Sequence, residues 1–204
     1  MSSIIRDSDG NLLPIGVGAW EKTDFQKVEV LIEEYNTRRT SGGTMGWIDY
    51  NNSQPAVDMV AETWTNVPND GAGPFTNRAY APGGINELLD VSTGMIDPRE
   101  LSLGDIMFIR NDFTITPSIN NSALEFRYTL GSGANAYTLE KSIARMDRGS
   151  GIPYRFALRV DNIYMGDENT RNNMIGVQVK CSADATLLNA GSVIEVIKRG
   201  SVET

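Results

Sequence analysis

The stretch Leu124-Glu125-Phe126-Arg127-Tyr128-Thr129-Leu130 alternates apolar and polar side chains at every position. Successive side chains of a β-strand point to opposite faces of the sheet, so the four apolar residues would share a core face. The three polar residues would then face solvent or a partner. A helix would instead place apolar residues three and four positions apart. The stretch therefore predicts a strand with one buried face.

The same alternation recurs on both sides of this stretch. Its apolar positions are Ile109, Phe113 and Ile115; Tyr154, Phe156, Leu158 and Val160; and Ile175, Val177, Val179 and Cys181. Between the members of the second set lie Arg155, Ala157, Arg159 and Asp161, which the pattern assigns to the polar face. Further strands are predicted near residues 47–50, 57–64, 137–143 and 193–197.

The segments between these strands are rich in Gly, Asn, Asp, Ser and Pro, which supply positive φ angles and local side-chain-to-backbone hydrogen bonds. About eight strands joined by such turns, with no helices alternating between them, predict a mostly β, antiparallel sandwich or barrel. The clearest turn segments are 68–71, 81–84, 131–133 and 148–151.

Residues 1–44 differ from the remainder, and we interpret them as an N-terminal attachment arm preceding a β domain at 45–204. Thr23-Asp24 resembles a helix cap, and the apolar spacing that follows it favours a short helix. The alternation of Val28, Val30 and Ile32 leaves a strand as the alternative. The apolar residues with helical spacing are Phe25, Val28, Leu31, Ile32 and Tyr35.

Charge and hydropathy exclude several classes of binding partner. The 204 residues include 26 acidic and 18 basic side chains, for a net charge of −8. The acidic residues are spread along the chain, which argues against a nucleic-acid backbone or an anionic membrane as the partner. No stretch approaches the roughly 18 apolar residues of a membrane-spanning helix. The first residues lack the apolar block of a signal peptide, so we expect synthesis in a cytoplasm without export.

The sequence offers little for catalysis. It contains no histidine, which removes the commonest general base and most zinc sites. The single cysteine, Cys181, lies among alternating apolar residues and is interpreted as a buried hydrophobe. Glu125 and Asp161 could form a glycosidase-type pair, but both fall on predicted polar strand faces. The oxygen-rich segment 165–173 is interpreted as a hydrogen-bonded turn and not as a calcium loop. We therefore expect no enzyme, no cofactor and no metal.

Aromatic residues concentrate in the first part of the β region. They bury large areas and lose little entropy on ordering, so they are favoured at interfaces and equally in cores. We take five of them as candidate interface residues: Trp47, Tyr50, Trp64, Phe75 and Tyr80.

Four segments together resemble a group of phage virion proteins with a jelly-roll fold, which is distantly similar to tumour-necrosis-factor-like trimers. The resemblance spans roughly residues 45–200. It implies an antiparallel jelly-roll β-sandwich that assembles as a homotrimer in a virion, after synthesis in the cytoplasm of a host bacterium. The segments are Gly46-Trp47-Ile48-Asp49-Tyr50, residues 61–75, Leu101-Ser102-Leu103-Gly104-Asp105-Ile106 with residues 109–112, and Asn162-Ile163-Tyr164-Met165-Gly166-Asp167.

Three functions follow as hypotheses. The first is a capsid decoration or cement protein, whose partners are copies of itself and the major capsid protein or another virion protein. The second is a tail-fibre or receptor-binding tip that recognises a host glycan or protein through loops 131–137 and 166–173. The third is a carbohydrate-active enzyme on a β-sandwich. The number of copies per virion separates the first two, and turnover of polysaccharide would identify the third.

Overall fold

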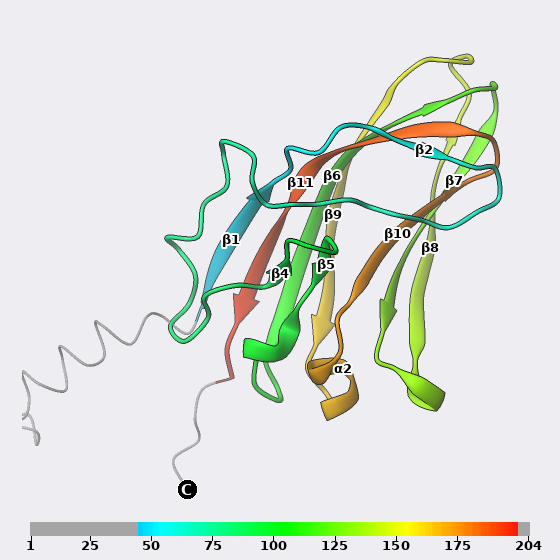
Figure 1. Cartoon of the computed structure of the whole chain (residues 1–204). Helices are drawn as coiled ribbons and strands as arrows, with labels where there is room; N and C mark the ends of the chain where they lie inside the picture. The colour runs from blue at the N-terminus through cyan, green and yellow to red at the C-terminus, as the bar shows by residue number, and fades with distance from the viewer. Residues whose placement is uncertain (1–44, 200–204) are drawn as a thin grey trace, which may run out of the picture. The chain divides into compact units, whose positions relative to one another are not determined.

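The computed structural model describes residues 45–199, so the arm at 1–44 and its predicted helix lie outside the described residues. The short helical elements are the 3-10 turns η1 (Pro98–Glu100) and η2 (Gly133–Asn135) and helix α2 (Glu168–Asn172). The strands, drawn in Figure 1, are β1 (Met45–Asn51), β2 (Val57–Met59), β3 (Thr65–Asn66), β4 (Leu89–Asp90), β5 (Met95–Ile96), β6 (Ile106–Pro117), β7 (Ser122–Leu130), β8 (Tyr137–Met146), β9 (Tyr154–Tyr164), β10 (Gly176–Cys181) and β11 (Ala185–Ile197).

Eight of these strands form two antiparallel four-stranded layers. Sheet 1 has the order β1-β11-β6-β9, with β2 alongside one end of β11, and sheet 2 has the order β3-β10-β7-β8. Every connection between consecutive members of the eight, except the β7–β8 hairpin, crosses from one sheet to the other. This interleaving of two Greek keys defines a jelly roll. The fold class predicted from the sequence is confirmed.

The core lies between the sheets and is built from the inward residues of the alternating strands. Leu124, Phe126, Tyr128 and Leu130 are all buried, as the alternation predicted. The rings of Phe126 in sheet 2 and Phe113 in sheet 1 stack with centroids 6.3 Å apart. Cys181 is also buried, and burial raises the pKa of its thiol. Burial of such side chains supplies the main stabilisation of the sandwich.

The predicted strand over residues 57–64 is wrong in its extent. β2 ends at Met59, and a turn closed by the hydrogen bond from Thr63 N to Val60 O (3.1 Å) separates it from β3. Within this turn Glu62 has a φ of +58°. β2 pairs with β11 in sheet 1 and β3 pairs with β10 in sheet 2, so the chain changes sheets here. Local alternation contains no signal for such a change.

A β-bulge reverses the facing of β9. Ile109 pairs with Asp161 while Asn111 pairs with Leu158, so β9 carries one extra residue over this interval. A one-residue insertion exchanges the two faces of the strand beyond it. Asp161 consequently points between the sheets and accepts a hydrogen bond from Lys141 Nζ at 2.6 Å. The prediction that Asp161 lies on the outer face is wrong for this reason.

The turn before β6 has the form expected from the Leu-Gly-Asp sequence. Gly104 adopts a φ of +92°, a region that favours glycine. The Asp105 side chain is buried and accepts hydrogen bonds from Ser102 N (2.8 Å) and Arg199 N (2.7 Å). Its carboxylate therefore ties the start of β6 to the chain that follows β11.

The free edge of β1 is covered by the loop that precedes β4. Asp49 exchanges backbone hydrogen bonds with Asn77 at 3.0 and 2.9 Å, and Trp47 N donates to Tyr80 O at 2.9 Å. An uncovered edge strand would present unpaired backbone groups to other chains. This cover removes the β1 edge from contact with other chains and leaves the outer face of sheet 1 available.

Candidate interaction surfaces

A row of apolar side chains crosses the outer face of sheet 1. Met45 pairs with Ile197, Ile197 with Ile106, and Ile106 with Tyr164, so the four side chains lie side by side on four adjacent strands. Met45 is 59%, Ile197 37% and Tyr164 67% exposed, and Ile106 is half-buried. We call these four residues the apolar row. Directly paired residues lie about 5 Å apart, so the row is one continuous surface and not a set of isolated side chains.

Two of the predicted interface aromatics extend this surface. Trp47 lies on the same face two residues after Met45, and its ring stacks on Tyr80 with centroids 4.8 Å apart. Tyr80 is 57% exposed. Phe108 is half-buried on the same face of β6 and pairs with Glu195, the residue that also pairs with Trp47. The aromatic pair and the row lie together at one end of sheet 1, where the exposed Glu195 side chain separates Trp47 from Phe108.

Charged groups occupy the next part of the same face. Arg110 Nη2 lies 2.8 Å from Asp112 Oδ2, whereas Asp112 Oδ1 is buried without a hydrogen-bond partner. Burial raises the pKa of Asp49; the Arg110 charge opposes this effect and the Asp112 charge adds to it. This part of the face therefore carries a buried carboxylate oxygen with no hydrogen-bond donor among the described residues.

The outer face of sheet 2 is polar and its groups bind one another. The Trp64 ring lies under the guanidinium of Arg127 (4.1 Å) and the ammonium of Lys180 (4.9 Å). Arg127 Nε donates to Gln178 Oε1 at 2.7 Å, and Lys180 pairs with Glu125. Trp64, a predicted interface residue, is half-buried within this network.

The other two predicted interface residues differ in burial, since Phe75 is exposed and Tyr50 is buried. Phe75 is 77% exposed, in the loop that covers β1. Tyr50 is 0% exposed, and its hydroxyl accepts a hydrogen bond from Leu88 N at 2.7 Å. Burial and the neighbouring Glu87 raise the Tyr50 pKa, so the phenol stays protonated. We correct its assignment from interface to core, because the alternation of β1 sends Tyr50 inward with Ile48.

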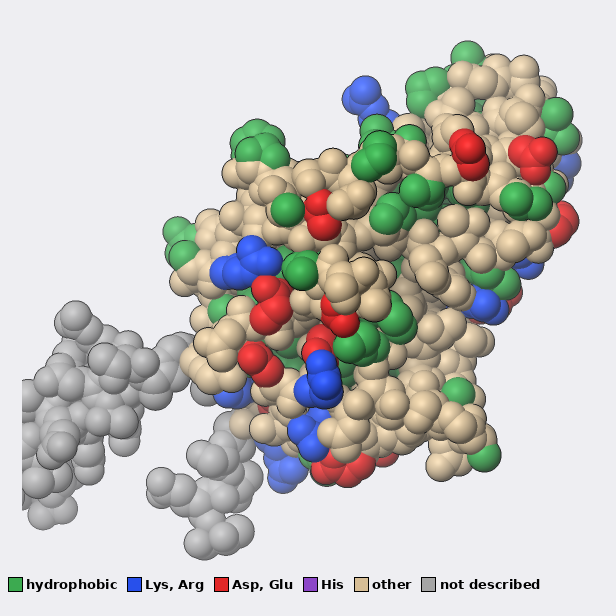
Figure 2. All heavy atoms as spheres, in the orientation of Figure 1, with side chains coloured by type: hydrophobic (Ala, Val, Ile, Leu, Met, Phe, Trp, Pro, Cys, Tyr) green, Lys and Arg blue, Asp and Glu red, His purple; other side chains and the backbone are tan. Residues whose placement is uncertain are grey.

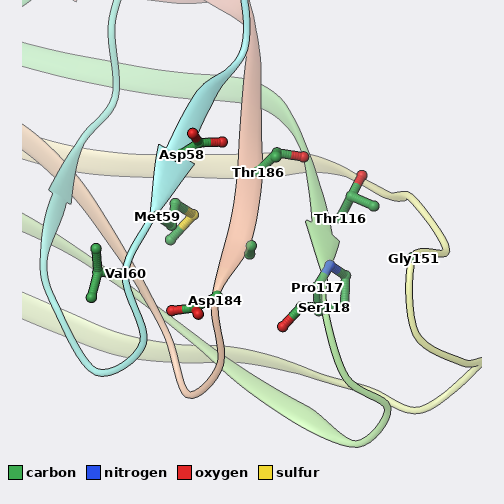
Figure 3. A pocket seen from close by; sticks show the side chains of 10 residues that line it. Asp58, Met59, Val60, Thr116, Pro117, Ser118, Gly151, Asp184 and Thr186 are labelled. Atoms are coloured by element: carbon green, nitrogen blue, oxygen red, sulfur yellow. The ribbon is translucent and has the colours of Figure 1, made fainter.

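A hollow of about 600 Å³ lies at the opposite end of sheet 1 (Figure 3). Hydroxyl groups of Thr116, Ser118 and Thr186 line it together with apolar atoms of β2 and β11. The carboxylate of Asp184 already accepts from Ala61 N at 2.8 Å. The hollow therefore offers a partner hydroxyl and methyl groups and the exposed carboxylate of Asp58 (Figure 3), and the sequence pattern gave no sign of it.

A second cleft, of about 360 Å³, opens between the edge strands β8 and β9. Lys141 and Asp161 meet in it, one from each sheet. Glu125, the other member of the carboxylate pair considered for a glycosidase, lies on the outer face of sheet 2 with Lys180. The two carboxylates are on different faces, so the structure does not bring that pair together.

The two loops predicted to recognise a receptor lie against each other. Ser132 N donates to Asn169 Oδ1 at 3.1 Å, and the hydroxyls of Tyr137 and Thr170 are 3.2 Å apart. Asp167 caps α2 by accepting from Thr170 N at 2.8 Å, and this backbone hydrogen bond lowers the pKa of the exposed Asp167 carboxyl. Most of the oxygen-rich segment is thus the short helix α2 with its cap, where the sequence predicted a hydrogen-bonded turn. Over residues 45–199 no group of three or more acidic, Cys or His side chains is arranged to hold a metal ion.

Charges of both signs are interspersed on the face shown in Figure 2, with hydrophobic side chains in small groups between them. That face therefore presents no field of a single sign. Among the helices in the described part of the chain, none has the length and apolar character needed to cross a membrane.

No protein-family model and no curated protein sequence matches the chain. Among solved structures, Eiger TNF from S. frugiperda is similar with a TM-score of 0.43 and 12% identity, over 78% of this chain and 94% of that one. Infectious bursal disease virus, Gt strain, is similar with a TM-score of 0.40 and 11% identity, over 79% of this chain and 34% of the viral chain. The VP2 subviral particle of that virus has a TM-score of 0.29 and 14% identity, over 74% and 34% of the two chains. This chain thus spans about a third of the length of the viral chains. Likenesses this distant identify no function, and the jelly-roll assignment depends on the strand order.

Proposed function

We propose that this protein is a non-enzymatic structural component of a phage virion, which assembles as a homotrimer and decorates the head. The observation that carries the self-association is the apolar row on the outer face of sheet 1. The virion setting and the number of three copies come from the resemblance of the sequence to trimeric virion jelly rolls.

The apolar row supports contact with a second protein surface because it is continuous and exposed. Burial of apolar area contributes roughly 25 cal/mol per Å². Fully burying one large apolar side chain therefore contributes about 1.5–3 kcal/mol, and the row offers Met45, Ile197 and Tyr164 for this. Arg110 and Asp112 beside the row supply charges of both signs, and in a three-membered ring the row of each copy would pack against a different surface of its neighbour.

In a cyclic trimer the apolar row is buried in every copy, and three equivalent contacts attach the trimer to the capsid. In a closed ring every copy uses the same surfaces, so the exposed row disappears from all protomers at once. A trimer then attaches to the head through three equivalent contacts, and weak single contacts give strong overall binding. The net charge of −8 keeps the free chains apart from one another until the specific surfaces meet.

The deciding experiment measures mass and capsid binding with the full chain. We expect a trimer by light scattering, and binding to undecorated capsids of the same phage at hundreds of copies per particle. Met45→Lys should weaken self-association by at least about tenfold, because it places a charge in the row. The matched control is Val91→Lys, which adds the same charge at a 54% exposed aliphatic side chain in the turn between β4 and β5.

Val91→Lys should leave the mass unchanged. A protein that is monomeric and does not bind capsids contradicts the proposal, as does a Met45→Lys variant that remains fully trimeric.

The alternative function, a receptor-binding tip of a tail fibre, is favoured by one observation. The loops at 131–137 and 166–173 join at the end of the sandwich, next to the cleft between β8 and β9. Copy number decides between the two locations: tens of copies or fewer per virion would replace the head assignment by the tail.

A further inference from the structure

Four polar side chains interrupt the apolar interior at one edge of the sandwich. Asn111, Tyr128, Lys141 and Asp161 come from β6, β7, β8 and β9, so each sheet contributes two. Asn111 Nδ2 donates to the Tyr128 hydroxyl at 2.8 Å, and Lys141 Nζ donates to Asp161 Oδ1 at 2.6 Å. Asn111 is 3% and Tyr128 1% exposed. The cluster therefore runs from the buried interior to the cleft between β8 and β9.

Stability does not account for this cluster. Polar groups lose hydration when they are buried, and an ion pair between two sheets is often no more stabilising than apolar side chains of the same volume. Asp161 reaches its position only because of the bulge in β9, and bulges commonly re-aim side chains beside functional sites. The arrangement thus places a fixed carboxylate and ammonium where a ligand in the cleft can contact them.

The hydrogen bonding leaves the cluster with defined donors and acceptors. Burial, together with the charge of Asp161, raises the pKa of Tyr128, so its phenol keeps its proton at neutral pH. Because Asn111 donates to the phenol oxygen, the phenol proton is directed to another acceptor. Asp161 and Lys141 remain partly accessible, with 27% and 35% of their side chains exposed. A ligand in the cleft can therefore reach a carboxylate that the interior holds in place.

The walls of the cleft suit a sugar ring. Its volume of about 360 Å³ falls within the range of small-molecule sites. Tyr164, 67% exposed, and Leu139, 43% exposed, offer apolar surface to ring C–H groups, and Asn162 offers an amide. Among the residues that line the cleft, Lys141 is the only basic side chain, and Asp161 neutralises it. An anionic ligand would find no unpaired positive charge there.

We propose that the cleft between β8 and β9 binds one neutral hexose unit of a glycan. The hydroxyls of a sugar both donate and accept, which matches a carboxylate, an ammonium and an amide set around an apolar wall. The inference needs no capsid, although the cleft shares Tyr164 with the apolar row of sheet 1.

The test is saturation-transfer NMR on the full chain, with glucose, galactose, mannose and N-acetylglucosamine as probes and N-acetylneuraminic acid as the anionic comparison. We expect transfer to at least one neutral sugar and none to the anionic one. Asp161→Asn should weaken binding by at least about tenfold, because it removes the acceptor charge and the partner of Lys141. Glu125→Gln is the matched control, because it alters a carboxylate–lysine pair on the outer face of sheet 2.

A second variant distinguishes loss of binding from loss of the fold. Tyr164→Ala changes an exposed side chain at the rim and should also abolish saturation transfer, with an unchanged circular dichroism spectrum. Tyr164 also belongs to the apolar row, so binding is measured on the Met45→Lys variant as well. No transfer to any neutral sugar, or binding that survives both Asp161→Asn and Tyr164→Ala, overturns the inference. A preference for N-acetylneuraminic acid does so too.

Discussion

The two outer faces of the sandwich differ in whether their apolar side chains are covered. Sheet 2 covers its one outer aromatic, Trp64, with Arg127 and Lys180 from its own strands. Sheet 1 leaves Met45 and Tyr164 uncovered at the ends of the apolar row. A face whose polar groups are satisfied internally gains little from a partner, whereas an exposed apolar row gains the free energy of dehydration. The alternation typical of strands therefore does not itself distinguish a solvent face from a contact face.

The largest expected effect is a loss of stability when one glycine in each sheet is replaced by alanine. Gly191 lies in the irregular part of β11 with a φ of +139°, and an added Cβ would lie 2.2 Å from Tyr50 O. Gly191→Ala should therefore lower the free energy of unfolding by about 3 kcal/mol, because the clash is with backbone. Gly176→Ala in sheet 2 meets Thr129 Oγ1 at 2.4 Å, a side chain that can rotate, and should cost about 1 kcal/mol. Urea denaturation of both variants checks the order; equal losses would contradict it.

An intermediate effect distinguishes the two outer tryptophans. Trp64→Ala should destabilise each chain by about 1–2 kcal/mol, through loss of packing and of two cation–π contacts, and leave the oligomer mass unchanged. Trp47→Ala should instead weaken self-association, because Trp47 and Tyr80 extend the apolar row. Light scattering across a dilution series, read beside thermal melting, separates the two outcomes. A mass change in Trp64→Ala with none in Trp47→Ala would assign the contact face to sheet 2.

The smallest expected effect is a pH dependence of stability that comes from Asp49 in sheet 1. Burial raises the pKa of Asp49 above 3.8, so the folded chain holds this proton to a higher pH than the unfolded chain does. Its contribution is fully present below the unfolded value and is lost as the pH rises through the folded pKa. Asp49→Asn should thus be slightly more stable than the parent at pH 7, and the difference should vanish below about pH 4. Thermal melting at both pH values measures it, and a variant less stable at pH 7 would contradict the reasoning.

Much of the fold could be predicted from local patterns. The alternation at 124–130 identified β7 and its buried face, and Leu-Gly-Asp identified the turn before β6. The prediction over 57–64 missed the change of sheet after Met59, because that change is set by pairing with β10 and β11, far away in the chain. Asp161 was placed on the wrong face because a single extra residue in β9 leaves the local pattern intact.

The candidate surfaces could be predicted only in part. Trp47, Phe75 and Tyr80 were singled out as aromatics and do lie exposed or half-exposed. Tyr50 has the same composition signal and is buried, since its position in β1 has the opposite parity to that of Trp47. The β8–β9 cleft gave no signal, because its polar residues come from three separate strands, β7, β8 and β9.

That this chain forms strands with one apolar face each follows from local sequence alone, since the period of the side chains is a local property of extended backbone. Which outward residues are neighbours depends instead on how the strands pair in the folded chain. Met45, Ile106, Tyr164 and Ile197 are far apart in the chain and form a row only through the register of β1, β11, β6 and β9. Register depends on bulges, turns and pairing between distant segments, and none of these is encoded within a single strand.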